Sequence, residues 1–136
     1  MTDAQSGQVS VFVMGAAVIC FAIAGIAIDG TRTFLYRRTL QNAADAAALA
    51  GASEIDRRAY YSGREEIALN DVEARAAALR WLARRGLPVD AEVVATPAVV
   101  RVGVRARLAT TFLGLVGITD LPVAAESVAE PLPGLP

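Results

Sequence analysis

An uninterrupted apolar run near the N-terminus constrains this chain more than any other feature of its sequence. Residues 9–28 are apolar apart from one serine, and no charged residue occurs between Asp3 and Asp29. Because a helix rises about 1.5 Å per residue, about twenty residues cross a hydrocarbon core of about 30 Å. The run is apolar on every side, which disfavours a buried helix of a soluble protein. We therefore predict a transmembrane helix at 9–28, preceded by a short N-terminal segment at 1–8.

A cleaved signal peptide is the main alternative to a retained anchor. Such a peptide carries a basic n-region, a shorter apolar region and an Ala-x-Ala-like cleavage site. Residues 1–8 contain neither Lys nor Arg, and no clean cleavage site closes the apolar run. These observations favour a retained membrane anchor.

Composition narrows the classes of function. The chain has 136 residues, which leaves room for one small domain beyond the anchor, and its net charge of −1 does not point to nucleic acid. It has no His, which removes the commonest general base and metal ligand. Its one cysteine, Cys20, lies in the apolar run, where it serves as a small apolar residue. We expect no enzyme activity, cofactor, metal or small-molecule substrate.

The segment after the apolar run, residues 29–52, continues the helix in sequence terms. It lacks Pro and is rich in Ala, Leu, Arg and Gln, which are good helix formers. Small residues at spacings of three and four form a flat face that allows another helix to approach closely. Two interpretations stay open: this face packs on the chain's own domain, or it packs on neighbouring subunits. The residues of the face are Leu40, Ala43, Ala44, Ala47, Ala50 and Gly51.

The segment 29–52 contains two acidic residues, Asp29 and Asp45. Asp29 stands where the apolar run ends, and Arg32 follows one turn later, so the two side chains can neutralise each other. Gln41 and Asp45 are four residues apart and share a helix face. Our hypothesis is that Asp29 and Asp45 dock against Arg side chains of a partner subunit or of this domain.

The order of these features carries a family resemblance. The motifs are, in order, Gly7-Gln8, the apolar run, Asp29-x-x-Arg32, Arg37-Arg38 and Leu40-Gln-Asn-Ala-Ala-Asp-Ala-Ala-Ala-Leu-Ala-Gly-Ala52. This order resembles the Tad-type domain of TadE/TadG-like pilus-assembly proteins. The resemblance implies a structural or assembly component, minor pilin or pseudopilin-like, of a bacterial tight-adherence (Tad/Flp) pilus or related secretion apparatus. Its implied partners are membrane lipid and other pilus proteins, reached through the N-terminal helix. The implied motif and subunit-packing residues are Asp29, Arg32, Leu40, Gln41, Ala44, Asp45, Ala47, Ala48 and Gly51.

Two features depart from this family pattern or compete with it. A prepilin peptidase would cut between Gly7 and Gln8, but the fifth residue after Gly7 is Phe12 where processed pilins carry Glu. Three arginines follow the span, and charge alone would therefore place the C-terminal domain in the cytoplasm. The resemblance places it outside the cytoplasmic membrane. The alternative function is a generic single-pass membrane adaptor, or a signal-anchored exported interaction domain, unrelated to pili.

The remaining sequence predicts a small α+β domain at 53–130, followed by a Pro-rich tail at 131–136. A polar connector leads to a helix at 70–86, with Asn70 as N-cap and Gly86 as terminator. We expect strands at 91–96, 99–108 and 121–130, and a short apolar helix or turn at 110–117.

The predicted fold is thus a long N-terminal transmembrane helix that extends into a pilin-like domain. That domain contains a second helix and a three-stranded antiparallel sheet. On the second helix, Val72, Ala76, Leu79 and Ala83 form an apolar stripe that is predicted to be buried, and Trp81 and Leu82 are expected to broaden the buried surface.

Overall fold

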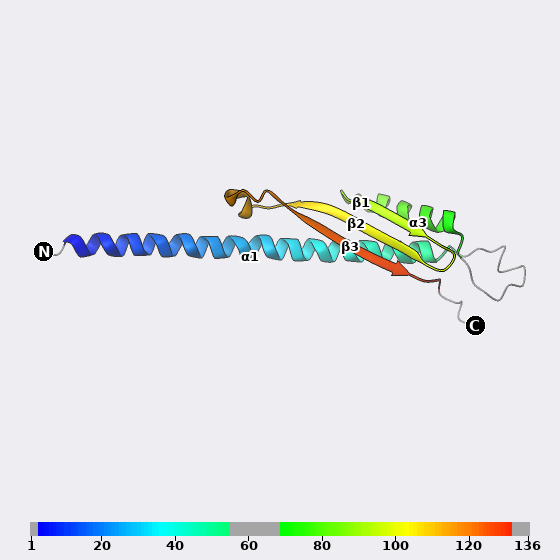
Figure 1. Ribbon diagram of the computed structural model, residues 1–136, viewed down its shortest axis with the longest axis horizontal. Coiled ribbons are helices and arrows are strands. Elements are labelled where there is room, and N and C mark those ends of the chain that lie inside the picture. Colours follow the sequence, from blue (N-terminus) through cyan, green and yellow to red (C-terminus); the bar gives the residue numbers. More distant parts are fainter. Residues whose placement is uncertain (1–2, 55–68, 132–136) are drawn as a thin grey trace, which may run out of the picture. The chain divides into compact units, whose positions relative to one another are not determined.

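The computed structural model describes residues 3–54 and 69–131, with side chains from residue 8 onward. Most of the connector predicted at 53–70, residues 55–68, and most of the tail predicted at 131–136, residues 132–136, lie outside the described residues. The element order confirms the predicted α+β fold of a long helix, a second helix and an antiparallel sheet (Figure 1). In chain order the elements are α1 (Asp3–Ala52), α3 (Asp71–Arg85), β1 (Asp90–Ala95), β2 (Val100–Ala109), the 3-10 helix η1 (Leu113–Val116) and β3 (Asp120–Ala129).

Helix α1 is continuous over 50 residues, so the apolar run and the motif segment 29–52 form one helix as predicted. It is long and apolar enough to cross a membrane. Most large side chains of the apolar run are exposed, including Phe12 at 79% and Phe21 at 75%. A helix that buries so little of its apolar surface within the chain leaves that surface for another apolar environment.

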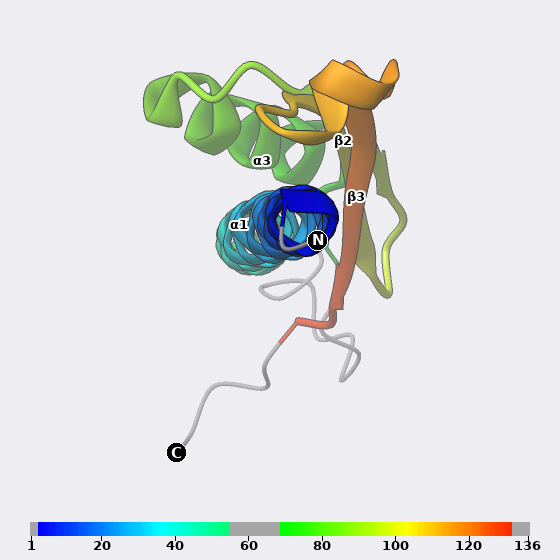
Figure 2. The ribbon, with the colours of Figure 1, turned by 90° about the vertical axis from the view of Figure 1, so that its left-hand side faces the viewer.

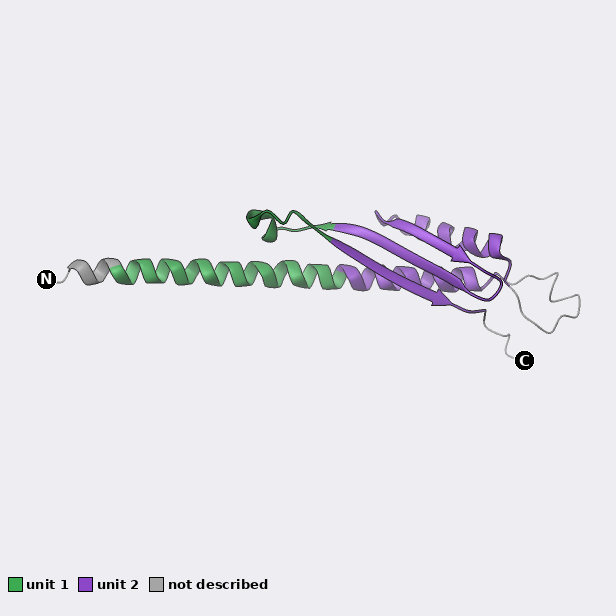
Figure 3. Cartoon of the chain, in the orientation of Figure 1, with its two compact units in different colours: residues 1–35, 108–121 green, residues 36–107, 122–136 purple. Residues whose placement is uncertain are grey.

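The chain divides into two compact units, each described here by itself (Figure 3). One unit comprises residues 36–107 and 122–136, and the other comprises residues 1–35 and 108–121. The first unit holds the C-terminal part of α1, helix α3 and most of the sheet. The second holds the N-terminal part of α1 and the loop that joins β2 to β3, residues 110–119, which we call the β2–β3 loop.

The sheet has the strand order β1-β2-β3. Strands β1 and β2 pair antiparallel, with Asp90 opposite Arg105 and Ala95 opposite Val100. Strand β2 alternates as predicted: Val100, Val102 and Val104 are buried, Arg101 and Arg105 are exposed, and Gly103 is half-buried. Within the first unit, helix α3 and the sheet lie on neighbouring sides of the C-terminal part of α1, as the view along α1 shows (Figure 2).

Helix α3 has the predicted ends. The Asn70 side chain accepts a hydrogen bond from the Glu73 N–H at 3.2 Å, and Gly86 ends the helix in the left-handed conformation with φ of 61°.

The stripe predicted to be buried on α3 is wrong, whereas Leu82, which was expected to broaden the buried surface, is buried at 6% exposure. The largest members of the stripe, Val72 and Leu79, are 73% and 39% exposed. The buried residues of α3 are Ala74, Ala77, Ala78 and Leu82. One close approach is visible at Gly51, where a Cβ would lie 2.9 Å from the Ala74 carbonyl oxygen of α3. An expectation based on side-chain hydrophobicity does not register such an approach and selects the neighbouring face.

The β2–β3 loop closes through its own backbone. The Thr110 N–H donates to the Thr119 carbonyl at 3.0 Å, next to the strand ends. The loop contains η1, which is followed by Gly117 in the left-handed conformation with φ of 92°. The short apolar helix or turn predicted to end at Gly117 is therefore present.

Candidate functional site

The Asp29 carboxylate and the β2–β3 loop form the most specific polar arrangement among the described residues. Asp29 follows directly on the apolar run and is only 2% exposed. It is the one charged side chain that is buried in the described part of the chain. A buried carboxylate requires compensating donors, because water no longer solvates it.

The donors are three consecutive backbone N–H groups of the β2–β3 loop. The Thr111 N–H donates to Asp29 Oδ1 at 2.9 Å, and the N–H groups of Phe112 and Leu113 donate to Oδ2 at 2.8 and 2.7 Å. Successive N–H groups that point to one spot form a concave anion site. Hydrogen bonds to an ionised acceptor are the stronger kind, and all three favour the charged form of Asp29.

Arg32 extends this site at its exposed side. Its Nη1 lies 3.9 Å from Asp29 Oδ1 and donates to the Thr111 hydroxyl. The predicted pairing of Asp29 with Arg32 is therefore present, at the long limit of an ion pair. The Arg32 side chain is 48% exposed, and such pairs contribute little to stability. Asp29 therefore docks within its own chain. Its main partners are backbone N–H groups, whereas the hypothesis named Arg side chains.

A glycine in the apolar run lets the loop reach the helix. A Cβ at Gly25 would lie 2.6 Å from the Phe112 Cβ, which is closer than two non-bonded carbon atoms can approach. Gly25 is four residues before Asp29, so both face the same side of α1. Gly25, Thr111, Phe112 and Leu113 were not among the predicted site residues. A glycine inside a helical pattern is a signal of close backbone approach, and it could have pointed to Gly25. No side-chain pattern marks backbone donors.

The small-residue face of the motif segment packs inside the chain's own domain, which is the first of the two interpretations. Of its predicted members, Leu40, Ala43, Ala44 and Ala47 are at most 4% exposed, whereas Ala50 is half-buried. The neighbouring Ala48 and Ala52 are buried as well. Gly51 belongs to the same face: a Cβ there would lie 2.9 Å from the Ala74 carbonyl oxygen and 3.0 Å from Val100 Cγ1. Contact of these residues with neighbouring subunits stays a prediction.

Gln41 and Asp45 interact on one face, as their spacing predicted. Gln41 Nε2 donates to Asp45 Oδ1 at 2.9 Å and also to the Glu126 carbonyl of β3 at 2.9 Å. The pair thus fixes the helix to an edge strand. A docking role of Asp45 towards an Arg of another subunit stays a prediction. The surroundings of Gly7 are not described, Gln8 is exposed, and cleavage between the two residues also stays a prediction.

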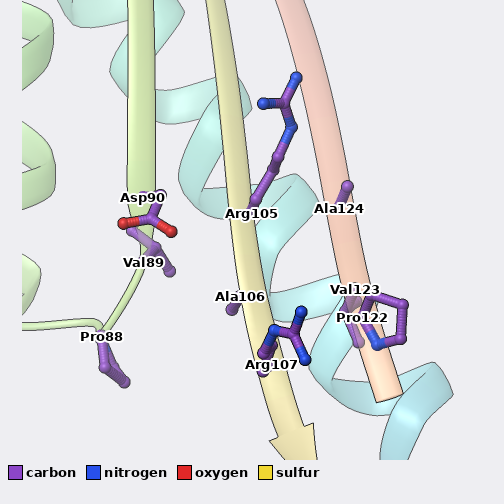
Figure 4. A pocket seen from close by; sticks show the side chains of 9 residues that line it. All are labelled: Pro88, Val89, Asp90, Arg105, Ala106, Arg107, Pro122, Val123 and Ala124. Atoms are coloured by element: carbon purple, nitrogen blue, oxygen red, sulfur yellow. The ribbon is translucent and has the colours of Figure 1, made fainter.

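A shallow pocket on the sheet is the strongest alternative site in the first unit (Figure 4). It carries Asp90, Arg105 and Arg107 between the strands, together with apolar residues and prolines. Asp90 and Arg105 are cross-strand neighbours, which accounts for their charges as an ordinary outer sheet face. The residues that the structure describes contain no group of three or more metal-ligating side chains.

Comparison with known protein families gives a match for the N-terminal part of the chain. Residues 7–54 match a family model described as putative Flp pilus-assembly TadE/G-like, which confirms the resemblance inferred from the motif. The match covers about a third of the chain and includes the apolar run, Asp29 and the small-residue face. No curated protein and no solved structure matches.

Proposed function

We propose that this chain is a membrane-anchored structural component, minor pilin or pseudopilin-like, of a bacterial Tad/Flp pilus or a related secretion apparatus. The observation that carries the proposal is the match of residues 7–54 to the Tad-type family model. All but the last two of these residues lie on α1, which combines an apolar run of membrane-spanning length with a buried small-residue face. The proposal assigns no catalytic role to the chain.

The anchor and the domain have separate tasks in this proposal. The apolar run at 9–28 holds the chain in the cytoplasmic membrane by its exposed apolar side chains. The domain is presented outside that membrane, as in the Tad-type resemblance. Fusion of alkaline phosphatase to the C-terminus tests this orientation, because the enzyme is active only when exported. An inactive fusion with intact expression would refute it.

Partner contacts need surface that the domain leaves free. On α1 beyond the apolar run, Phe34 and Leu49 are 68% and 56% exposed. Large exposed apolar side chains on a helix are suited to packing against a second helix. We assign the docking role of the motif segment to these exposed positions together with Asp45, which is partly covered by Gln41.

Replacing Asp45 by Ala tests the docking role. Co-purification of the variant with other pilus proteins is compared with that of Glu92→Ala, a control that removes an exposed carboxylate from β1. Loss of partners only in the Asp45 variant supports the role. Equal recovery of partners in both variants would refute docking through Asp45.

Co-purification with the wild-type chain tests the function as a whole. The full chain carries a C-terminal tag, is cross-linked in native membranes, and is purified in detergent. The proposal predicts that other pilus-assembly proteins are recovered. Recovery of membrane proteins without any pilus component would favour the generic single-pass adaptor.

A further inference from the structure

The β2–β3 loop carries large apolar side chains that the chain itself does not cover. Leu115 is 84% exposed, Val116 75% and Ile118 45%. Loops between antiparallel strands are ordinarily polar, because they project into water. An apolar loop tip indicates contact with another apolar phase.

The loop lies against the part of α1 that is predicted to cross the membrane. Phe112 packs over Gly25, and an open hollow of about 420 Å³ is lined by Phe21 and Ile26 of α1 and by Leu115 of the loop. Gly25 precedes Asp29 by four residues, or about 6 Å along the helix, and Phe21 precedes it by about 12 Å. The loop tip is thus at the level of the apolar run.

Most backbone N–H groups of the loop have partners within the protein, which favours a non-aqueous environment. In hydrocarbon, each peptide N–H must find a partner within the protein, since water is absent. The N–H groups of Thr111, Phe112 and Leu113 donate to the Asp29 carboxylate. Four further N–H groups of the loop donate to carbonyls of the same loop: those of Thr110, Leu115, Gly117 and Ile118.

From these observations we propose that the β2–β3 loop is a second membrane contact, dipping into the bilayer beside α1. Leu115, Val116 and Ile118 contact the acyl chains of the leaflet at the C-terminal end of the span. Asp29 and Arg32 lie at the level of the lipid head groups. Phe112 of the loop packs over Gly25, which lies about 6 Å along the helix from Asp29. This depth fits the range of about 5–10 Å at which interfacial apolar segments insert. The inference rests on the proposed membrane anchoring of α1.

Lipid is the occupant that the geometry favours. The exposed apolar surface of the loop is continuous with the apolar hollow against α1, whose own exposed surface must be covered by acyl chains along its length. A second protein chain would cover the tip only if it entered the membrane at the same place. That possibility is an outcome of the test.

The test uses tryptophan fluorescence in vesicles of phosphatidylcholine brominated at a defined depth. Trp81 is the only tryptophan, so Trp81→Phe in the full chain gives a background without emission. Single tryptophans are then introduced as Leu115→Trp, or Val116→Trp as a second loop variant. Phe12→Trp in the apolar run is the membrane control, and Val72→Trp on α3 is the water control; both sites are as exposed as the loop sites. Circular dichroism checks that each variant folds.

The proposal predicts loss of emission at both loop positions, greater with bromine near the head groups than with bromine near the chain ends. Phe12→Trp should be quenched in vesicles of either kind, and Val72→Trp in neither. Quenching of Phe12→Trp without quenching at 115 or 116 would overturn the loop contact while the anchor stands. If the loop emission is then blue-shifted, a protein neighbour covers the tip. An unquenched Phe12→Trp would refute the membrane anchor, and the loop contact with it.

Discussion

The contact between Gly51 and helix α3 gives a prediction whose size can be worked out from the structure. A Cβ at position 51 would lie 2.9 Å from the Ala74 carbonyl oxygen and 3.0 Å from Val100 Cγ1. The first neighbour is backbone, so it cannot move aside as a flexible side chain can. Gly51→Ala therefore forces α3 or β2 to shift. Inserting a methyl group into a packed core costs about 1–3 kcal/mol.

The same substitution also changes helix propensity, and a second glycine provides a control. Alanine in place of glycine stabilises a helix interior by about 1 kcal/mol. Gly30 lies in the same helix, and a Cβ there would meet nothing within 4 Å. Gly30→Ala thus changes propensity alone. Gly51 lies one residue before the end of α1, where the gain in helix propensity is smaller than at Gly30. The difference between the two variants therefore contains the steric cost of about 1–3 kcal/mol and up to about 1 kcal/mol of propensity, both in favour of Gly30→Ala.

Thermal unfolding of the full chain in detergent, followed by circular dichroism, measures this difference. In a domain of this size each kcal/mol shifts Tm by about 4–8 °C. Gly51→Ala should melt below Gly30→Ala by at least that amount, and Gly30→Ala should melt at or above the wild type. Equal melting temperatures for the two alanine variants would refute the close approach of α3 to α1.

Three further perturbations test other contacts. Leu40→Ala removes a fully buried side chain and should lower the free energy of unfolding, measured in urea, by about 2–5 kcal/mol. Leu49→Ala, at an exposed site on the same helix, is the control and should change that free energy by less than about 0.5 kcal/mol. Asn70→Ala removes the α3 cap and should cost about 1 kcal/mol in the same assay, and an unchanged urea midpoint would contradict the cap. Asp29→Asn puts an amide where three N–H groups need acceptors, so hydrogen exchange at 111–113 should accelerate while exchange in β1 is unchanged. Unchanged exchange at 111–113 would exclude the carboxylate as the group that holds the loop.

Local sequence rules predicted the elements of this fold because each has its own signal. The alternation of Val100, Val102 and Val104 with arginines indicates a strand with one buried face, and β2 has that face. Asn70 and Gly86 mark the ends of α3 by the hydrogen-bonding and conformational needs of helix termini. The absence of a helix breaker across 9–52 predicted the continuity of α1.

Contacts between elements were harder to predict, because they depend on how closely backbones approach. Val72 and Leu79 are large apolar residues of α3, yet α3 buries three alanines and Leu82, and its backbone at Ala74 lies close to Gly51. Asp29 was recognised as a docking residue, but its donors are backbone N–H groups, which every non-proline residue has. Such partners become visible only when the fold brings the β2–β3 loop to the helix.

The central claim, that this chain serves a Tad/Flp pilus, is tested most directly by counting surface pili. A strain that lacks the chain is compared by electron microscopy with the same strain carrying the full-length chain on a plasmid. The account predicts that pili per cell fall in the deletion strain and return with the plasmid. Normal numbers of pili of normal length in the deletion strain would contradict it.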